Sequence, residues 1–173
     1  VFIFASVAEV DAVVLDFEHG CISSNHVFDA KSAAERKNKM LWARLQKGSE
    51  GIASRIVDMG IDGIFVANVE IPEQISILTD SLSYPPIGYR GVGFSASNDF
   101  GQTLQAEISS KRRFPVIAMI ESSSGIDNLR EICGHKPAGV MIGPYDLSCS
   151  LGDIGNFDSK TYREAVAEIQ AVC

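Results

Sequence analysis

Six short apolar runs recur along the chain, and they constrain the fold more than any other feature of the sequence. They span residues 1–4, 12–15, 40–43, 63–67, 116–120 and 138–142. Most are apolar without alternation, as expected for strands that are covered on both faces, and such strands belong to parallel sheets flanked by helices. The sequence therefore predicts a parallel sheet as the centre of the fold.

Helix-like segments separate these runs. Residues 31–37 are rich in Ala, Glu and Lys, and segments 50–59 and 125–133 carry apolar residues at helical spacing. Segment 159–172 begins with a serine suited to cap a helix. This alternation predicts an α/β fold, either a barrel of eight βα units or an open doubly wound sheet.

The length suits one domain over residues 1–173, with enough of its 46% hydrophobic residues to form a sizeable core. A closed eight-unit barrel takes about 250 residues and rarely fewer than about 200. Only about eight residues separate Phe4 from Val13, whereas a helical crossover takes about a dozen. If the fold is a barrel, we expect residues to be missing near position 5 and after Cys173.

The charge balance argues against a nucleic-acid partner. The chain has 22 acidic and 15 basic residues and a formal net charge of −7, which disfavours contact with a phosphate backbone. No apolar run approaches the roughly 20 residues of a membrane helix, and the N-terminus lacks the layout of a signal peptide. Four scattered cysteines predict neither a zinc site nor a disulfide framework. We expect a soluble, cytoplasmic protein with no membrane partner.

Three ionisable side chains end the stretch DAVVLDFEHG: Asp16, Glu18 and His19. The carboxyl ends of parallel strands face the ligand site in α/β folds. There, Asp16 could fix the tautomer of His19 and prepare it for general acid/base catalysis. The alternative is that His19 caps a loop and Asp16 accepts a backbone amide.

Two further strands end in a carboxylate, AMIE at Glu121 and VMIGPYD at Asp146. Two carboxylates without Cys or His favour a hard divalent cation such as Mg²⁺ or Mn²⁺. Their alternative role is to cap helices. Arg44 ends the run MLWAR, where its guanidinium could bind a carboxylate or an oxyanion, or form a surface salt bridge instead.

The segment 83–101 is the one long irregular stretch, and loops of that length are often functional. Its GYRGVG sequence lacks the order of a nucleotide-binding loop. Arg90 in this loop is therefore open to either a structural or a substrate-facing role.

Together these motifs resemble the HpcH/HpaI aldolase family, divalent-metal-dependent aldolases that use pyruvate and are relatives of the citrate lyase β chain. The matching pieces follow the family's order: VVLDFEHG, the strand ending in Arg44, DMGIDGIFVANVE, YPPIGYRGVG, IAMIES and GVMIGPYDLSCSLG. The resemblance implies a (β/α)₈ TIM barrel, here lacking its last two units, in a homo-oligomer that is a hexamer or a trimer. It also implies cleavage of a 4-hydroxy-2-oxoacid to pyruvate and an aldehyde.

The resemblance assigns roles by position. It implies metal ligation by Glu121 and Asp146, with Mg²⁺, Mn²⁺ or Co²⁺ as the cofactor, and acid/base catalysis by His19 acting with Asp16. Arg44 matches the pyruvate-binding arginine. The turn that holds the pyruvate carboxylate matches Gly143, Pro144, Tyr145 and Asp146.

The sequence departs from the family at two positions near the site. Met119 stands where many members carry Gln, and Leu-Gln-Lys follows Arg44 in place of a Val-Pro type of continuation. Two other functions stay open. One is a citryl-CoA or malyl-CoA type lyase, which would need a basic patch, and residues 111–113 form the only local basic cluster. The other is a non-catalytic assembly subunit with the same fold.

Overall fold

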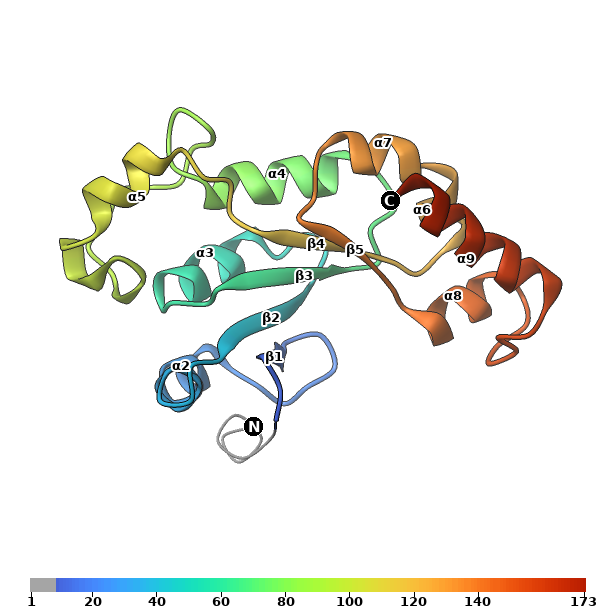
Figure 1. The fold of residues 1–173 in the computed structure, drawn as a ribbon, viewed down its shortest axis with the longest axis horizontal. Helices are drawn as coiled ribbons and strands as arrows, with labels where there is room; N and C mark the ends of the chain where they lie inside the picture. Colours follow the sequence, from blue (N-terminus) through green and yellow to red (C-terminus); the bar gives the residue numbers. More distant parts are fainter. Residues whose placement is uncertain (1–8) are drawn as a thin grey trace.

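The computed structural model describes residues 9–173, and its five strands form one parallel sheet. The strands are β1 (Ala12–Asp16), β2 (Met40–Gln46), β3 (Gly63–Ala67), β4 (Val116–Ile120) and β5 (Gly139–Ile142). They lie side by side in the order in which they occur in the chain (Figure 1). Five of the six predicted strands are thus confirmed, and the run 1–4 lies outside the described residues.

The strand order distinguishes between the two predicted architectures. A doubly wound sheet reverses its strand order at a switch point, and no reversal occurs among β1 to β5. Because parallel crossovers are right-handed, an unreversed order places the connecting helices on one face of the sheet. This is the winding of a (β/α)₈ barrel, of which the described residues form five strands.

Eight α-helices and two 3₁₀ helices connect the strands in the described part of the chain. They are η1 (Ser24–His26), α2 (Val27–Glu35), α3 (Glu50–Asp58), α4 (Glu73–Leu82), η2 (Ala96–Gly101), α5 (Leu104–Ser110), α6 (Ser123–Asp127), α7 (Leu129–Gly134), α8 (Pro144–Ser150) and α9 (Lys160–Val172). The predicted helical segments correspond to α2, α3, α6 with α7, and α9. The sequence reasoning missed α4, α5 and α8.

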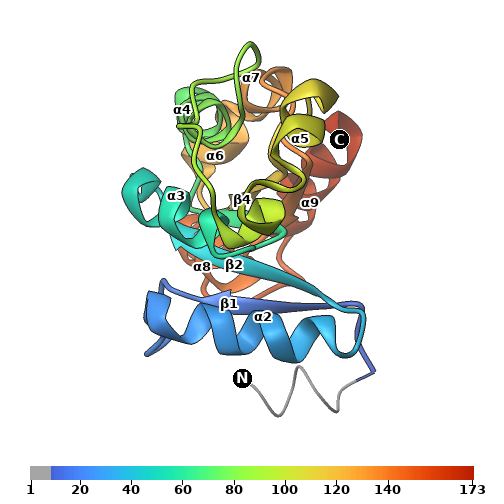
Figure 2. The ribbon, with the colours of Figure 1, turned by 90° about the vertical axis from the view of Figure 1, so that its left-hand side faces the viewer.

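Alternate residues of each strand pack against the helices. Leu15, Leu41 and Ile64 are fully buried among helix residues such as Ile56 and Ile75. Figure 2 shows the pairing of helix and strand at one edge, where α2 lies along β1 and contacts it. These contacts form the core between the sheet and its outer helices.

The inner face of the sheet is only partly covered, which corrects the expectation of strands buried on both faces. Val14 and Met141 are 44% and 43% exposed. Together with four other inward-facing side chains, they line a cavity of about 270 Å³. The reason is that five strands curve without closing, so this face lacks opposing strands among the described residues.

Strand β2 is longer than predicted and continues past Arg44 to Gln46. Leu45 pairs with Val66 and is 1% exposed, and Gln46 pairs with Ala67. Leu45 and Gln46 therefore keep pairing with β3, because neither is a proline that would remove a donor from the ladder.

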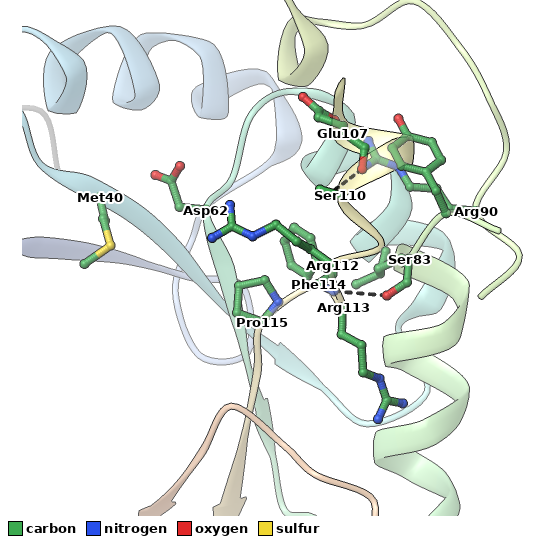
Figure 3. A pocket seen from close by; sticks show the side chains of 12 residues that line it. Met40, Asp62, Ser83, Arg90, Glu107, Ser110, Arg112, Arg113, Phe114 and Pro115 are labelled. Carbon is green, nitrogen blue, oxygen red and sulfur yellow. Dashed lines mark hydrogen bonds between the residues drawn. The ribbon is translucent and has the colours of Figure 1, made fainter. Parts of the chain in front are cut away.

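A separate cavity of about 540 Å³ lies at the amino ends of the strands (Figure 3). Met40 begins β2, and Asp62 and Pro115 precede β3 and β4. Arg112 points into this cavity from the segment between α5 and β4.

The side chain of Arg90 is 9% exposed and pairs with Asp58 at 2.7 Å. Its guanidinium lies 4.7 Å from the centre of the Tyr84 ring. These contacts favour a structural role for Arg90, which also lines this cavity.

Within residues 9–173, the structure contains no helix that is long and apolar enough to cross a membrane.

Candidate active site

The carboxyl ends of the strands bring the predicted site residues to one edge of the sheet. Asp16 ends β1 and is directly opposite Arg44 in the register of β1 and β2. Glu121 follows the last residue of β4, and Gly143 follows the last residue of β5. Because all five strands are parallel, these positions share the end at which α/β barrels place their active sites.

Asp16 and Arg44 form a two-point ion pair. Arg44 Nε donates to Asp16 Oδ1 at 3.0 Å, and Arg44 Nη2 donates to Asp16 Oδ2 at 2.5 Å. This pairing lowers the pKa of Asp16 to about 2 and raises the pKa of Arg44. The side chains of Arg44 and Asp16 are 26% and 32% exposed, so the pair is a partly buried salt bridge on the inner face of the sheet.

His19 has Glu18 as its acidic neighbour. Its Nε2 lies 3.8 Å from Glu18 Oε2, and its side chain is 68% exposed. Asp16 contacts His19 through the backbone, because Asp16 Oδ1 accepts the amide of His19 at 3.2 Å and that of Glu18 at 3.0 Å. Asp16 therefore accepts backbone amides, which is the alternative role expected from the sequence, and it does so in addition to its ion pair with Arg44. Arg44 also reaches Glu18, with Nη1 3.5 Å from Oε2.

Glu121 is a buried carboxylate at the centre of this edge. It is 7% exposed, and Oε2 accepts the backbone amide of Asn68 at 2.6 Å. Burial raises its pKa, and the nearby carboxylates of Asp146 and Glu18 add to that rise. Ser122, rather than Glu121, caps helix α6, so Glu121 is not the helix cap that the sequence left open.

Gly143 is required by space rather than by its backbone torsion. Its φ of −92° suits any residue, but a Cβ at this position would lie 2.1 Å from Glu121 Oε1. The glycine therefore makes room for the buried carboxylate. It also caps α8, which places Asp146 in the first turn of that helix and excludes a capping role for Asp146.

The sequence predicts that four residues, 143–146, hold the substrate carboxylate, and two of them have a backbone amide that can donate to a ligand. The amide of Gly143 donates to Ile120, and Pro144 has no amide hydrogen. Tyr145 and Asp146 lie in the first turn of α8, where amides have no acceptor within the helix. The Tyr145 ring packs against the Phe157 ring, with their centres 5.2 Å apart.

Two cavities adjoin these groups. One of about 350 Å³ contains the predicted residues His19, Glu121 and Asp146, and its lining is Glu18, His19, Asn68, Glu121, Ser122, Asp146, Cys149 and Ser150. The other, on the inner face of the sheet, is lined by Asp16 and Arg44 together with apolar side chains that include Met119. Arg44 connects the two through its contact with Glu18.

Sequence reasoning did not assign roles to Glu18, Asn68 or Ser122, all of which line the cavity of about 350 Å³ beside Glu121. Asn68 has a positive φ of 52° directly after β3, and this conformation presents its amide to Glu121. Asn after a strand is a recognisable signal, because Asn adopts this conformation more readily than most residues. Ser122 carries a weaker signal, since serine before a helix suggests only a cap.

The residues present fit a hard divalent cation. Among residues 9–173, no group of three or more His, Cys, Asp or Glu side chains is arranged to hold a metal ion. Mg²⁺, however, is commonly bound through one or two carboxylates and keeps several waters and substrate oxygens as its other ligands. Glu121 and Asp146 provide two, and a cation would stabilise the charged form of Glu121, which burial and the neighbouring carboxylates disfavour.

Comparison with known proteins decides the family. The sequence profile described as HpcH/HpaI aldolase/citrate lyase matches residues 3–173. The chain belongs to this family.

One relative and one solved structure show how similar the chain is to known proteins. A 5-keto-4-deoxy-D-glucarate aldolase from Klebsiella pneumoniae is 31% identical over 166 residues, which cover 95% of this chain and 65% of that protein. The chain thus spans just under two thirds of the length of this relative. The crystal structure of an HpcH/HpaI aldolase from Desulfitobacterium hafniense superposes with a TM-score of 0.87 at 24% identity, over 98% of this chain and 66% of that one. This likeness shows the TIM-barrel fold.

A more distant structure is that of a ligand complex. It is protein CitE from Mycobacterium tuberculosis in complex with magnesium and pyruvate, with a TM-score of 0.55 and 18% identity. The match covers 94% of this chain and 59% of that chain.

Proposed function

We propose that this chain carries the active site of a divalent-metal-dependent aldolase, which cleaves a 4-hydroxy-2-oxoacid to pyruvate and an aldehyde. The observation that carries the proposal is the buried Glu121 beside Asp146, with Arg44 and His19 at the same edge of the sheet. The aldolase relative from Klebsiella pneumoniae supports the same reaction class.

Glu121 and Asp146 would hold the cation. When bound, a divalent cation there would supply Lewis-acid polarisation of the 2-oxo group. The carboxylate of the substrate is expected at the start of α8, where the amides of Tyr145 and Asp146 can donate to it.

Arg44 supplies a fixed positive charge for the oxygen of the developing enolate. Its pairing with Asp16 raises its pKa, so it stays charged throughout the working pH range. The same pairing fixes the guanidinium in place, and donors that are already oriented stabilise a developing charge without reorganisation.

His19 would accept the proton of the 4-hydroxyl group as the C3–C4 bond breaks. Its ring lines the cavity beside Glu121, and its Nε2 atom lies 3.8 Å from Glu18 Oε2. The aldehyde leaves, and the proton on His19 is then available for the C3 carbon of the enolate, which becomes the methyl group of pyruvate.

The location of the basic cluster disfavours a CoA ester as substrate. Arg112 and Arg113 line the cavity at the amino ends of the strands (Figure 3), and Arg113 is paired with Asp80 at 3.1 Å. Residues 115 and 121 are separated by about 20 Å along an extended strand. Phosphates bound by these arginines would therefore lie at the end opposite Glu121.

Self-association in the cytoplasm is part of the proposal. Segment 83–101 exposes large apolar side chains, among them Tyr89 at 63%, Phe94 at 78% and Phe100 at 73%. Such exposed groups support contact with further copies of the chain. The cytoplasmic location is supported by the small number and scattered spacing of the cysteines, which form no dense disulfide framework of the kind found in small secreted domains.

The test is an assay of pyruvate release from 4-hydroxy-2-oxoacids by the metal-loaded protein. We expect release that stops with a chelator and returns with Mg²⁺ or Mn²⁺, and we expect none from Glu121→Gln. If activity survives the chelator and borohydride traps pyruvate on the protein, the enzyme uses a Schiff base instead. If no oxoacid is cleaved by a folded, metal-binding protein, the assembly-subunit alternative replaces the enzyme.

A further inference from the structure

Two cysteines far apart in the sequence meet on the outer layer of helices. Cys133 lies in α7 and Cys173 follows α9, 40 residues later, and their Sγ atoms are 3.8 Å apart. The two helices pack against each other, as Figure 1 shows for the end of the chain. A disulfide bond is about 2.05 Å long, so the sulfurs need to approach by less than 2 Å, roughly the reach of small side-chain rotations.

The backbone on each side of this pair is held in place. Leu129 and Ile132 of α7 are 1% and 0% exposed, and Ile169 of α9 is 4% exposed. The amide of Cys173 donates to the carbonyl of Ile169 at 3.1 Å, and the carbonyl of Cys133 accepts the amide of Lys136 at 2.9 Å. The closeness of the sulfurs thus follows from the packing of two helices on the core.

The other two cysteines provide the contrast. Cys21 and Cys149 are exposed thiols, and within the described residues neither has a sulfur in contact. Only the Cys133 and Cys173 pair has the proximity that an intramolecular bond requires.

We propose that Cys133 and Cys173 are a modification site that forms a reversible disulfide and links α7 to α9. This inference is independent of the aldolase reaction, because neither cysteine lines the cavities beside Glu121 and Arg44.

A small-molecule disulfide such as glutathione disulfide is the oxidant. Cys173 is exposed, so its thiolate attacks one sulfur of the oxidant, forms a mixed disulfide and releases one glutathione thiolate. Cys133 then loses its proton to solvent and attacks Cys173 Sγ, which releases the second glutathione. Two protein thiols are oxidised to one disulfide, and one small-molecule disulfide is reduced to two thiols.

Cys133 takes the second role because it is the more buried thiol. Burial raises its pKa to about 11, and the neighbouring Cys173 adds to the rise. Its thiolate is scarce at neutral pH, so attack on the mixed disulfide is the slower step. In a reducing compartment the link would form only under oxidising conditions and reopen afterwards.

The first experiment is peptide mapping after oxidation of the native, previously reduced protein with glutathione disulfide. Free thiols are alkylated, and unreduced digests are analysed by mass spectrometry. We expect one linked peptide pair, containing Cys133 and Cys173, that lacks two hydrogens and separates on reduction. A sample oxidised in denaturant should instead distribute its links among all four cysteines. Native protein that carries glutathione on Cys173 while Cys133 stays alkylatable would overturn the proposal.

Thermal unfolding of oxidised and reduced protein is the second experiment. Closing a 40-residue loop is expected to raise the melting temperature by about 5–15 °C. Cys173→Ser should abolish this rise, whereas the matched change Cys149→Ser should retain it. An equal rise in Cys173→Ser, or none in wild type, would contradict the proposed link.

Discussion

At the scale of single residues, Arg44 organises the acidic end of β1. Its guanidinium binds both oxygens of Asp16 and also approaches Glu18. Replacing it with lysine keeps the charge but removes the planar fork of donors. We expect Arg44→Lys to lose about 10²-fold or more of kcat/KM for pyruvate release, the size seen when a preorganised oxyanion donor is removed.

The control for Arg44→Lys is Arg113→Lys. Arg113 also pairs with an aspartate, but at the opposite end of the sheet. A rate near that of wild type is expected for this control. If Arg44→Lys were equally active, Arg44 would be a structural residue.

The contribution of Asp16 to the free energy of unfolding depends on pH. Its folded pKa of about 2 is below the ordinary 3.8, so its contribution is fully present above pH 3.8 and is lost as the pH falls through about 2. The side chain is about one third exposed, and solvent screening reduces the contribution to about 1–2 kcal/mol.

The measurement is urea denaturation of wild type and Asp16→Asn between pH 2 and pH 7. We expect the variant to be less stable by about 1–2 kcal/mol at pH 7 and the gap to shrink towards zero near pH 2. A gap that is independent of pH would show that the ion pair with Arg44 does not stabilise the fold.

Gly143 tests the space around Glu121. An alanine Cβ would lie 2.1 Å from Glu121 Oε1, whereas at Gly139 of β5 the nearest atom is 3.8 Å away, on Ile117. We expect Gly143→Ala to displace the carboxylate and to weaken Mn²⁺ binding by about 10–100-fold, the range typical for disturbed support of a metal ligand. Calorimetric titration checks this, and unchanged affinity would contradict the packing argument. Gly139→Ala should bind Mn²⁺ as wild type does.

The residue types of the site could be predicted from the sequence, but their pairing could not. Asp16, Arg44, Glu121 and Asp146 are recognisable because charged groups follow apolar strands. Which group contacts which depends on the register of β1 and β2 and on helix positions, and no local pattern specifies these. For this reason the sequence suggested Asp16 as the partner of the His19 ring, whereas the structure places Glu18 beside it.

At the scale of elements, Gly63 and Trp42 show how β2 and β3 fit together. A Cβ at Gly63 would lie 2.3 Å from the Trp42 ring, and Trp42 also packs on Phe65 with ring centres 5.3 Å apart. We expect Gly63→Ala to destabilise the protein by about 1–3 kcal/mol through overpacking. Urea denaturation measures this loss.

The strand glycine Gly139 again provides the matched control, because its added Cβ meets only ordinary contact. Gly139→Ala should change stability by about 1 kcal/mol or less. The second change Trp42→Leu should reduce the cost of Gly63→Ala. Equal effects of the two glycine changes would contradict a role for the Trp42 ring.

The elements themselves were predicted unevenly. Five strands were found because each is a short apolar run, but β2 exceeds its apolar run through pairing with β3. The helical segment 125–133 is two helices, since Asn128 interrupts it and its side chain donates to the carbonyl of Glu70 at 2.8 Å. Such tertiary contacts move helix boundaries and leave no local sequence pattern.

At the scale of the whole molecule, the sequence indicated a parallel α/β fold but left the barrel and the doubly wound sheet open. The two architectures share the same strand and helix patterns and differ only in the spatial path of the crossovers. The unreversed order β1 to β5 settles this point. It also explains why residues from four separate strand ends meet at one edge.

The central claim is that Glu121 and Asp146 together hold a divalent cation, and Mn²⁺ binding by isothermal titration calorimetry tests it most directly. We predict one ion per chain for wild type, loss of binding in Glu121→Gln and in Asp146→Asn, and retained binding in Glu18→Gln, which changes a carboxylate of the same cavity. Circular dichroism confirms that each variant is folded. Undiminished Mn²⁺ binding in folded Glu121→Gln and Asp146→Asn would contradict the account.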